Sequence, residues 1–408
     1  MSGAIERVLT AATARRPAEA WLDARGRIVS DRANALRVVA SGTPVYGFST
    51  LLGHLDSVSS SGAADQQLLL DAHLVGPRSE ASGTFLDLVS ACKAEQLSHG
   101  GSGVREETYL AVLDAFGSLP ARGAWLASYS SGDVVPAAWW ASARVVDRLT
   151  EFDAGDVICL INGSFYGAAH AMGSASSALA AIVQVLARLS RTAPALSGVG
   201  VPEVDALRPY FLSHVAISVQ RPVSLRDASP SVLTLVRAVR DAIDAVEHRL
   251  GAPSANPLFV GGETLSQSSF LDFETTRALR GLEMAVRLAA GLVQRMIVEG
   301  CDAATPAGVQ PPKIAAAALV AHRSPGLASF VGDESHGIED LRDLSLIASC
   351  ELSAAVTVVE TLLDIHDAAL GAPGPTTVDE IAGVVAATVA PRVSPSLLAT
   401  AARVRLPL

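Results

Sequence analysis

Five short segments follow one another along this chain of 408 residues, and they hold side chains that can bind anions or move protons. A tyrosine can act as a general base when its pKa is lowered, and an arginine can hold a carboxylate through two parallel hydrogen bonds. The side chains with such chemistry are Tyr46, the triplet Ser130-Ser131-Gly132, Asn162, Gln220, Arg226 and Glu334.

Each segment alone also has an ordinary structural interpretation. The triplet can form a plain turn before a helix, with Ser131 or Asp133 as the N-cap residue. Glu334 can be a solvated loop carboxylate. The other candidates can serve packing, turns or helix caps, and these are Tyr46, Asn162, Gln220 and Arg226.

Taken in order, the segments resemble the aromatic amino acid lyase family, the histidine and phenylalanine ammonia-lyases and related aminomutases. The resemblance covers residues 27–370 and implies a mostly helical fold and a homotetramer whose sites combine residues of three subunits. It rests on Val45-Tyr46-Gly47, Ser130-Ser131-Gly132-Asp133, Leu160-Ile161-Asn162-Gly163, residues 220–226 (QRPVSLR), Ala255-Asn256-Pro257-Leu258 and Glu334.

The resemblance also implies an internal electrophile. In the family, an Ala-Ser-Gly triplet cyclises and loses water to give 4-methylideneimidazol-5-one (MIO), and the matching residues here are Ser130-Ser131-Gly132. Serine at the first position is compatible with this ring, because only its backbone carbonyl enters it. Glycine at the third position removes the Cβ atom that would oppose the close approach. The sequence leaves open whether the ring forms.

Catalytic roles follow from the same resemblance. Tyr46 corresponds to the general base that removes the β-proton of the substrate, and Asn162 to the amide that binds near the MIO oxygen and the carboxylate. Glu334 corresponds to the carboxylate that holds the substrate ammonium group or takes its proton.

Substrate-binding roles fall on two pairs of residues. Gln220 and Arg226 match a family motif whose arginine clamps the substrate carboxylate. His73 and Leu74 fall near the pair of residues that determines substrate selectivity in the family, where a His-Leu pair is similar to the tyrosine-type enzymes. The alternative is that His73 has a purely structural role. The implied substrate is an aromatic α-amino acid, used in specialised metabolism. Ammonia-lyases and aminomutases share these residues, so the residues do not distinguish the two activities.

Besides Ser130, three departures from the family bear on its chemistry. Arg221 stands for an aspartate, Val223 for a tyrosine that helps catalysis and ring formation, and Thr264 for an aromatic residue beside the ring. Two further hypotheses therefore stand beside the MIO enzyme. One is an enzyme of the same fold that works without MIO by elimination, addition or cyclisation, and the other is a non-catalytic homologue.

The composition of the chain limits the classes of partner and the cellular compartments that we expect. The net charge is −10 and lysine is nearly absent, which argues against nucleic-acid binding. Only 18% of the residues are charged, which favours surface buried between subunits. The cysteines are far apart in the sequence, so we expect no metal site and a protein located in the reducing cytoplasm. We also expect no membrane-spanning helix and no signal peptide. The cysteines are Cys92, Cys159, Cys301 and Cys350.

The hydrophobic pattern predicts a mostly α fold, with a mixed, mainly helical head and a bundle of long helices. Apolar residues recur every three or four positions in segments that we expect to be helices, and residues 22–29 are expected to form a small hairpin. The expected helices are residues 173–191, 231–250, 275–299 and 340–370. The predicted divisions are a head at 1–136, a bundle at 137–370 and a C-terminal helical segment at 371–408.

Overall fold

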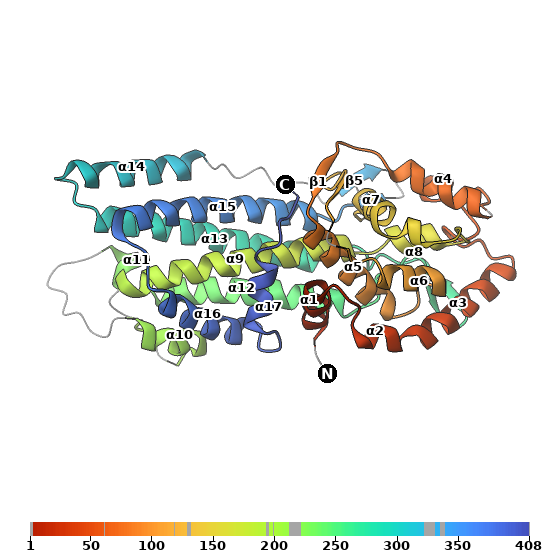
Figure 1. Cartoon of the computed structure of the whole chain (residues 1–408), viewed down its shortest axis with the longest axis horizontal. Helices are drawn as coiled ribbons and strands as arrows, with labels where there is room; N and C mark the ends of the chain where they lie inside the picture. Colours follow the sequence, from red (N-terminus) through yellow and green to blue (C-terminus); the bar gives the residue numbers. More distant parts are fainter. Residues whose placement is uncertain are drawn as a thin grey trace.

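The computed structural model shows an elongated molecule with a head at one end and a bundle of long helices at the other (Figure 1). It describes residues 3–60, 62–117, 119–128, 132–192, 196–198, 200–211, 222–321, 331–334 and 339–407. The predicted class is confirmed, because helices make up most of this part of the chain and the strands are short.

The head is built mainly from short helices around α5, which is almost wholly buried. Three two-stranded antiparallel sheets complete it, and two of them come from later in the chain. The head helices are α1 (Ala4–Ala14), α2 (Glu19–Asp23), α3 (Arg25–Ala40), η1 (Gly53–Leu55), α4 (Ala63–His73), α5 (Gly83–Ser98), α6 (Glu106–Leu113), α7 (Val134–Arg144), η2 (Val146–Arg148) and α8 (Asp156–Ile161). The sheets pair β1 (Ser79–Ala81) with β2 (Ala121–Gly123), β3 (Leu258–Val260) with β4 (Glu263–Leu265), and β5 (Val331–Glu334) with β6 (Glu339–Leu341).

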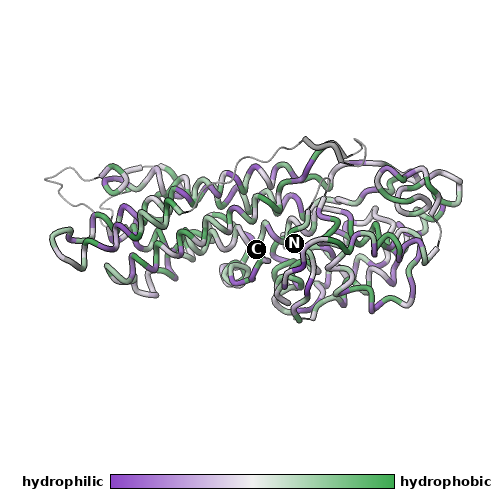
Figure 2. Tube along the Cα trace, turned by 90° about the horizontal axis from the view of Figure 1, so that it is seen from above, coloured by the Kyte–Doolittle hydropathy of each residue, from purple (hydrophilic) through white to green (hydrophobic). Residues whose placement is uncertain are grey.

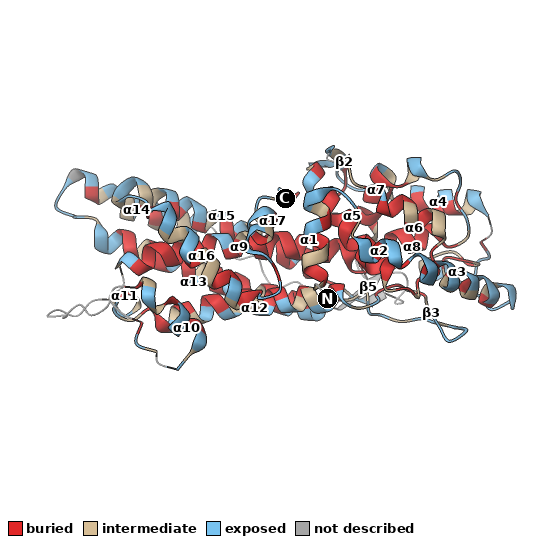
Figure 3. Cartoon of the chain, turned by 60° about the horizontal axis from the view of Figure 1, so that its bottom comes forward, coloured by how far each residue is buried: buried red, intermediate tan, exposed pale blue. Residues whose placement is uncertain are grey.

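Four long helices form the bundle and pack against one another: α9 (Phe165–Thr192), α12 (Ser229–Leu250), α13 (Phe273–Gly300) and α15 (Ser345–Leu370). Buried residues concentrate along α9 and α5, whereas α3 is largely exposed (Figure 3). The shorter elements around the long helices are α10 (Pro202–Leu207), η3 (Arg208–Tyr210), α11 (Val223–Arg226), α14 (Pro306–Ala321), α16 (Pro375–Val389) and α17 (Pro395–Ala401).

The predicted bundle helices are confirmed, although α9 begins eight residues earlier than predicted. Apolar and polar residues alternate along α12 and α13, which bury one face and leave the other solvated (Figure 2). Helix α9, in contrast, is buried on nearly all sides. Helix α12 begins at Ser229 and ends before Gly251, and α13 begins after Asp272, whose side chain caps it. Helix α15 begins five residues later than predicted, because residues 339–341 form β6.

The predicted hairpin at residues 22–29 is wrong. This segment belongs to α2 and α3, and the buried side chains Trp21, Ala24 and Ile28 recur three and four positions apart. That spacing places them on one face of a helical segment, where they reach the core of the head. Gly26 lies in the exposed first turn of α3, where no neighbouring atom comes within 4 Å of an added Cβ.

The predicted divisions at residues 136 and 370 stay predictions. In the structure, α7 and α8 lie in the head, and the long bundle helices begin with α9 at Phe165 (Figure 1). Helices α16 and α17 pack against α9. Two helices are apolar and long enough to span a membrane by composition alone, but 83% and 50% of their most apolar windows are buried inside the molecule.

Candidate active site

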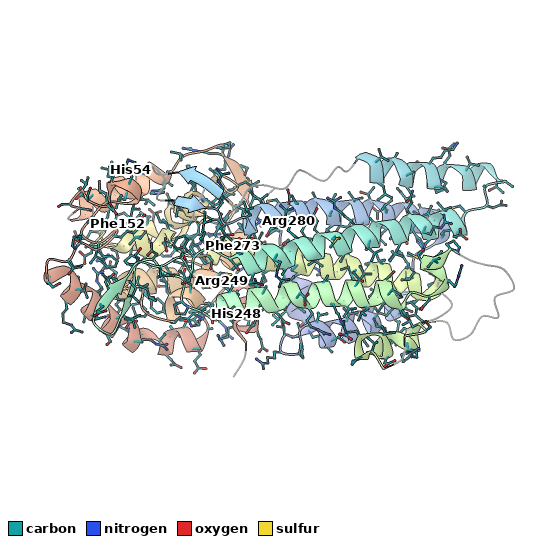
Figure 4. The ribbon with its side chains drawn as sticks, turned by 180° about the vertical axis from the view of Figure 1, so that it is seen from behind. His54, Phe152, His248, Arg249, Phe273 and Arg280 are labelled. Atoms are coloured by element: carbon teal, nitrogen blue, oxygen red, sulfur yellow. The ribbon has the colours of Figure 1, made fainter. Side chains whose placement is uncertain are left out.

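The ends of several helices meet where the head joins the bundle. The N-terminal ends of α9, α13 and α15 lie here together with the C-terminal ends of α5 and α12. Figure 4 shows Arg249 and Phe273 at the head-facing ends of α12 and α13, with Arg280 farther along the bundle. Helix ends leave backbone donors and acceptors unpaired, so this junction is suited to polar chemistry.

Asn162 lies at this junction, between α8 and α9, and is only 8% exposed. Its Oδ1 atom accepts a hydrogen bond of 2.9 Å from the backbone N–H of Asn256. A backbone N–H requires an oxygen acceptor, which fixes the orientation of the Asn162 amide. The Nδ2 end therefore points away from Asn256, and no hydrogen bond from it to another described residue is found. This end of Asn162 is available to donate to an anion.

Two side chains of α5 donate hydrogen bonds to the backbone carbonyl oxygen of Asn162. Lys93 Nζ donates to the Asn162 carbonyl oxygen at 2.9 Å, and Gln96 Nε2 donates to the same oxygen at 3.3 Å. Lys93 Nζ also donates to Gln96 Oε1 at 2.9 Å and lies 4.3 Å from the centre of the Phe165 ring. Lys93 is fully buried, and among the described residues no carboxylate pairs with it. Burial lowers the pKa of Lys93 to about 7.

Two buried carboxyl groups lie next to the predicted triplet. Burial, and then the charge of Asp343, raises the pKa of Asp133 to about 7, while Ser128 donates a hydrogen bond that opposes the shift. Burial likewise raises the pKa of Asp343 to about 6, although it accepts hydrogen bonds from the backbone N–H groups of Ser345 at 2.8 Å and Asp272 at 3.2 Å. Near neutral pH the pair therefore retains a proton.

Asp133 and Ser345 both approach α9 at Gly167. A Cβ atom at Gly167 would lie 2.5 Å from Ser345 Oγ and 3.0 Å from Asp133 Oδ2, so only glycine allows this approach. Asp133 takes the N-cap position of α7, but its side chain makes no capping hydrogen bond, and its buried Oδ1 atom has no hydrogen-bond partner among the described residues. This acid is not explained as a helix cap.

Arg249 and Asp272 extend this polar layer toward the bundle. Arg249 Nε donates to Ser164 Oγ just before the start of α9, while its buried Nη2 atom has no hydrogen-bond partner in the part of the chain that the structure describes. Burial lowers the pKa of Arg249, and the charges of Asp272 and Asp343 oppose that shift. Asp272 Oδ1 accepts from the Thr275 N–H at 3.0 Å, and Asp272 Oδ2 has no partner. Several buried polar atoms at the junction are thus unpaired, which is uncommon in a purely structural core.

The triplet itself is only partly described. Ser130 and Ser131 lie outside the described residues, and Gly132 has a φ angle of +106°. This backbone region favours glycine, in keeping with glycine as the third member of a strained turn. A Cβ atom on Gly132 would lie 3.8 Å from the ring of Phe270, which approaches the triplet from the segment before α13.

Tyr46 lies in a head loop that two neighbours hold in place. Its phenolic oxygen accepts a hydrogen bond of 3.0 Å from the Gly53 N–H. The buried Gln66 side chain donates to the Gly47 carbonyl at 3.2 Å and accepts from the Val157 N–H of α8 at 3.0 Å. Gln66 therefore ties this loop to the helix that leads to Asn162.

The structure places the predicted substrate-binding residues in different regions. His73 and Leu74 lie at the end of α4, where His73 Nδ1 is 2.7 Å from the Leu69 carbonyl oxygen. Arg226 lies in α11, at the end of the bundle farthest from the head (Figure 1). Helix α12 separates it from the junction by 22 residues, or about 33 Å. Within one chain, Arg226 does not meet Asn162.

Other predicted residues lie partly beyond the described part of the chain. Gln220 and Arg221 are outside it, and for Glu334 only the backbone is described, in strand β5 opposite Glu339. Val223 begins α11 and is 75% exposed. Thr264 pairs with Phe259 in the β3–β4 hairpin of the head.

Sequence reasoning missed Lys93, Gln66, Asp343 and Arg249. One signal for Lys93 was present, because it is one of two lysines in the chain and lies in a largely apolar stretch, residues 85–97. Charged residues on helices are usually solvated, so sequence alone does not distinguish these buried groups from surface ones.

Comparisons with known proteins agree with the resemblance that the motifs indicate. The family model for aromatic amino acid lyases matches residues 4–143. A histidine ammonia-lyase of Burkholderia multivorans is 27% identical over 354 residues, which cover 72% of this chain and 66% of that relative's length. The aligned region therefore spans slightly less than two thirds of this relative.

Solved structures with the same fold include two aminomutases. The phenylalanine aminomutase of Pantoea agglomerans matches with a TM-score of 0.70 at 12% identity, covering 98% of this chain and 92% of that one. The tyrosine aminomutase of Streptomyces globisporus matches with a TM-score of 0.72 at 16% identity, covering 99% and 98%. With the sequence matches, these structures confirm the family resemblance and the ammonia-lyase-like fold.

Proposed function

We propose that this chain, a relative of the aromatic amino acid lyases, is an MIO-type ammonia-lyase or aminomutase that acts on an aromatic α-amino acid. The relatives named above are ammonia-lyases and aminomutases, which supports carbon–nitrogen lyase chemistry at the level of the family. The observation that carries the proposal is the orientation of Asn162, whose amide donor end is available where the helix ends converge. A substrate carboxylate is an anion that such a donor binds.

The residues around the triplet fit the formation of MIO. Ring closure joins the Gly132 nitrogen to the Ser130 carbonyl carbon with loss of one water, and Ser131 then loses its hydroxyl group and α-proton as a second water. The left-handed backbone of Gly132 suits such a turn. The protonated, partly unpaired acid next to it, Asp133, is a nearby proton donor for a departing hydroxyl group.

Each protein group then has one task in the proposed reaction. The MIO ring would supply the electrophile that activates the substrate amine for departure. Asn162 donates a hydrogen bond to the substrate carboxylate, and Tyr46 removes the β-proton. Glu334 holds the ammonium group, and the ammonia then leaves or returns at the β-carbon. His73 and Leu74 contact the aromatic ring of the substrate.

We further propose a homotetramer, in which Gln220 and Arg226 serve the site of another subunit. The separation of about 33 Å between α11 and the junction supports this arrangement. Exposed apolar side chains on the outer bundle helices give a surface for association. They are Met284 at 70%, Val320 at 71%, Ile314, Leu288 and Ile347. A cytoplasmic location and a role in specialised metabolism complete the proposal.

A second candidate is an enzyme of the same fold that works without MIO. The replaced positions favour it: Val223 has no proton to transfer, and Thr264 has no aromatic ring to place beside an electrophile. Tyr46 and Glu334 would then carry an elimination, addition or cyclisation. A non-catalytic homologue is the third candidate.

The intact mass of the purified protein tests the MIO proposal. Ring formation removes two waters, about 36 Da, and peptide mapping over residues 125–140 would locate the deficit. Ser131→Ala is the matched control, because it cannot lose the side-chain hydroxyl group. A deficit in the wild type alone, with ammonia release from phenylalanine, tyrosine or histidine, is the expected result. An unmodified wild type would refute the MIO enzyme, and turnover would then separate the second candidate from the third.

A further inference from the structure

Lys93 is a buried amine whose environment a structural role does not explain. Its side chain is fully buried in α5, and its amine donates to two neutral oxygens, those of Gln96 and Asn162, each at 2.9 Å. A buried ammonium group normally pairs with a carboxylate, and none is found among the described residues. The side chain therefore keeps a titratable group in the core without the partner that would stabilise its charge.

The position of this amine connects it to the proposed substrate site through one residue. Lys93 binds the carbonyl oxygen of Asn162, while the side-chain amide of the same residue presents its donor end. The N-terminal end of α9 begins three residues later, at Phe165, and it directs a partial positive charge to the same place. A carboxylate bound by the Asn162 amide would be the missing counter-ion of Lys93.

We propose that Lys93 supplies the buried positive charge for the carboxylate that binds at Asn162, and that binding is coupled to uptake of one proton by Lys93. This inference rests on the proposed function, because it takes the Asn162 amide as a carboxylate site. Lys93 acts through Asn162 as a positioning residue. The balance is simple: the neutral amine takes a proton from solvent when the anion arrives, and it returns the proton when the anion leaves.

The groups around Lys93 do not remove the need for this proton. Cys159 of α8 faces the amine, but burial raises its pKa to about 12, so its thiol stays neutral. Glu95, on the same helix, pairs with Arg7 and accepts a hydrogen bond from the Trp21 indole. From α12, the cation Arg249 donates a hydrogen bond to Ser164, two residues from Asn162.

The free amine is poised for such a change. Because burial lowers its pKa to about 7, Lys93 is mostly neutral at pH 8. An anion close to it raises its pKa again, so it takes up a proton on binding. Above pH 7 the affinity for the anion should fall by up to about tenfold per pH unit, the limit for uptake of one proton.

Isothermal titration calorimetry of the full-length protein tests the proposal, with trans-cinnamate and trans-4-hydroxycinnamate as probes. Titration at pH 8 in buffers of different ionisation enthalpy measures the protons taken up per site. We expect uptake of up to about one proton by the wild type, and none with trans-cinnamamide, which has no carboxylate. Lys93→Met should bind the acids at least several-fold more weakly at pH 7 and without proton uptake. Lys313→Met, which changes the other lysine, on the exposed side of α14, should bind like the wild type.

The outcomes separate this inference from the proposed function. Wild-type binding without proton uptake would overturn the role of Lys93 and leave the enzyme proposal intact, even if the Lys93 variant failed to fold. The same holds if Lys93→Met retained the uptake. A wild type that bound neither acid and released no ammonia from any aromatic amino acid would refute the proposed function, and the inference with it.

Discussion

Replacing Lys93 by methionine should stabilise the protein at neutral pH and destabilise it at high pH. Burial lowers the pKa of Lys93 from 10.5 to about 7, so between these values the unfolded state binds the proton that the folded state lacks. Stability therefore rises with pH through this window, and the cost of the buried amine is fully present at pH 7 and below. The shift corresponds to about 5 kcal/mol at pH 7.

Methionine removes this cost but also removes two hydrogen bonds. The Asn162 carbonyl keeps its bond from Gln96 Nε2 at 3.3 Å, whereas Gln96 Oε1 is left without its donor. An unsatisfied buried acceptor costs about 1–3 kcal/mol. Lys93→Met should thus gain about 3 kcal/mol at pH 7 and lose between about 1 and 2 kcal/mol near pH 10.5, where the wild-type amine is neutral in the folded state and about half protonated in the unfolded state.

Urea unfolding followed by far-UV circular dichroism measures this difference at several pH values and one protein concentration. The wild type and Lys93→Met should show equal m-values and stability curves that cross between pH 7 and pH 10.5. Lys313→Met is the control, since this lysine is exposed and its removal should leave the pH dependence unchanged. A variant that is less stable than the wild type at pH 7, or a difference that does not vary with pH, would refute the reasoning.

Three further predictions concern other buried polar groups. Gln66→Leu should make the Tyr46 loop more mobile, because it removes the hydrogen bond to the Gly47 carbonyl oxygen. The backbone amides of the loop should then exchange faster in hydrogen-exchange measurements, and the variant enzyme should have a lower kcat with little change in KM. Asp343→Asn should stabilise the protein at pH 8 by about 1–2 kcal/mol but should not stabilise it at pH 4. The raised pKa values of Asp343 and Asp133 make the free energy of unfolding fall as the pH rises from about 4 to 7, and the substitution removes part of this loss. Equal effects of the substitution in urea unfolding at pH 4 and pH 8 would contradict this prediction. His170→Leu should raise stability by about 1–3 kcal/mol, because both ring nitrogens are buried without partners, and an unchanged urea midpoint would count against it.

The long helices could be predicted from the sequence because local and tertiary signals agree there. In α12 the apolar spacing, Pro230 in the first turn and Gly251 after the last turn all indicate the same element. The start of α15 could not be predicted, because the strand before it forms only by pairing with β5. The hairpin prediction for residues 22–29 is wrong because glycine, here Gly26, indicates a turn by sequence alone, whereas Trp21 and Ile28 are held in helices by burial against distant parts of the head.

The candidate site was predictable only where a motif marks it. Asn162 and Gly132 stand in recognisable strings, and the structure places them near the same junction. Lys93 and Asp343 lack such a string, and whether a charged side chain is buried depends on contacts between segments far apart in the chain. The roles of Tyr46 and Glu334 remain predictions, since they depend on the substrate.

The length of helix α12 sets the distance between the two ends of the bundle that the proposed shared site depends on. Helix α12 sets how far Arg226 stands from Arg249 at the head, and each turn of helix adds about 5.4 Å. An insertion of one turn in α12 would shift α11 past the neighbouring subunit, whereas the same insertion in a surface loop would leave that alignment unchanged. Selection for activity should therefore conserve the number of residues in α12 more strictly than their identity, and loops such as the one after Leu265 should vary freely in length.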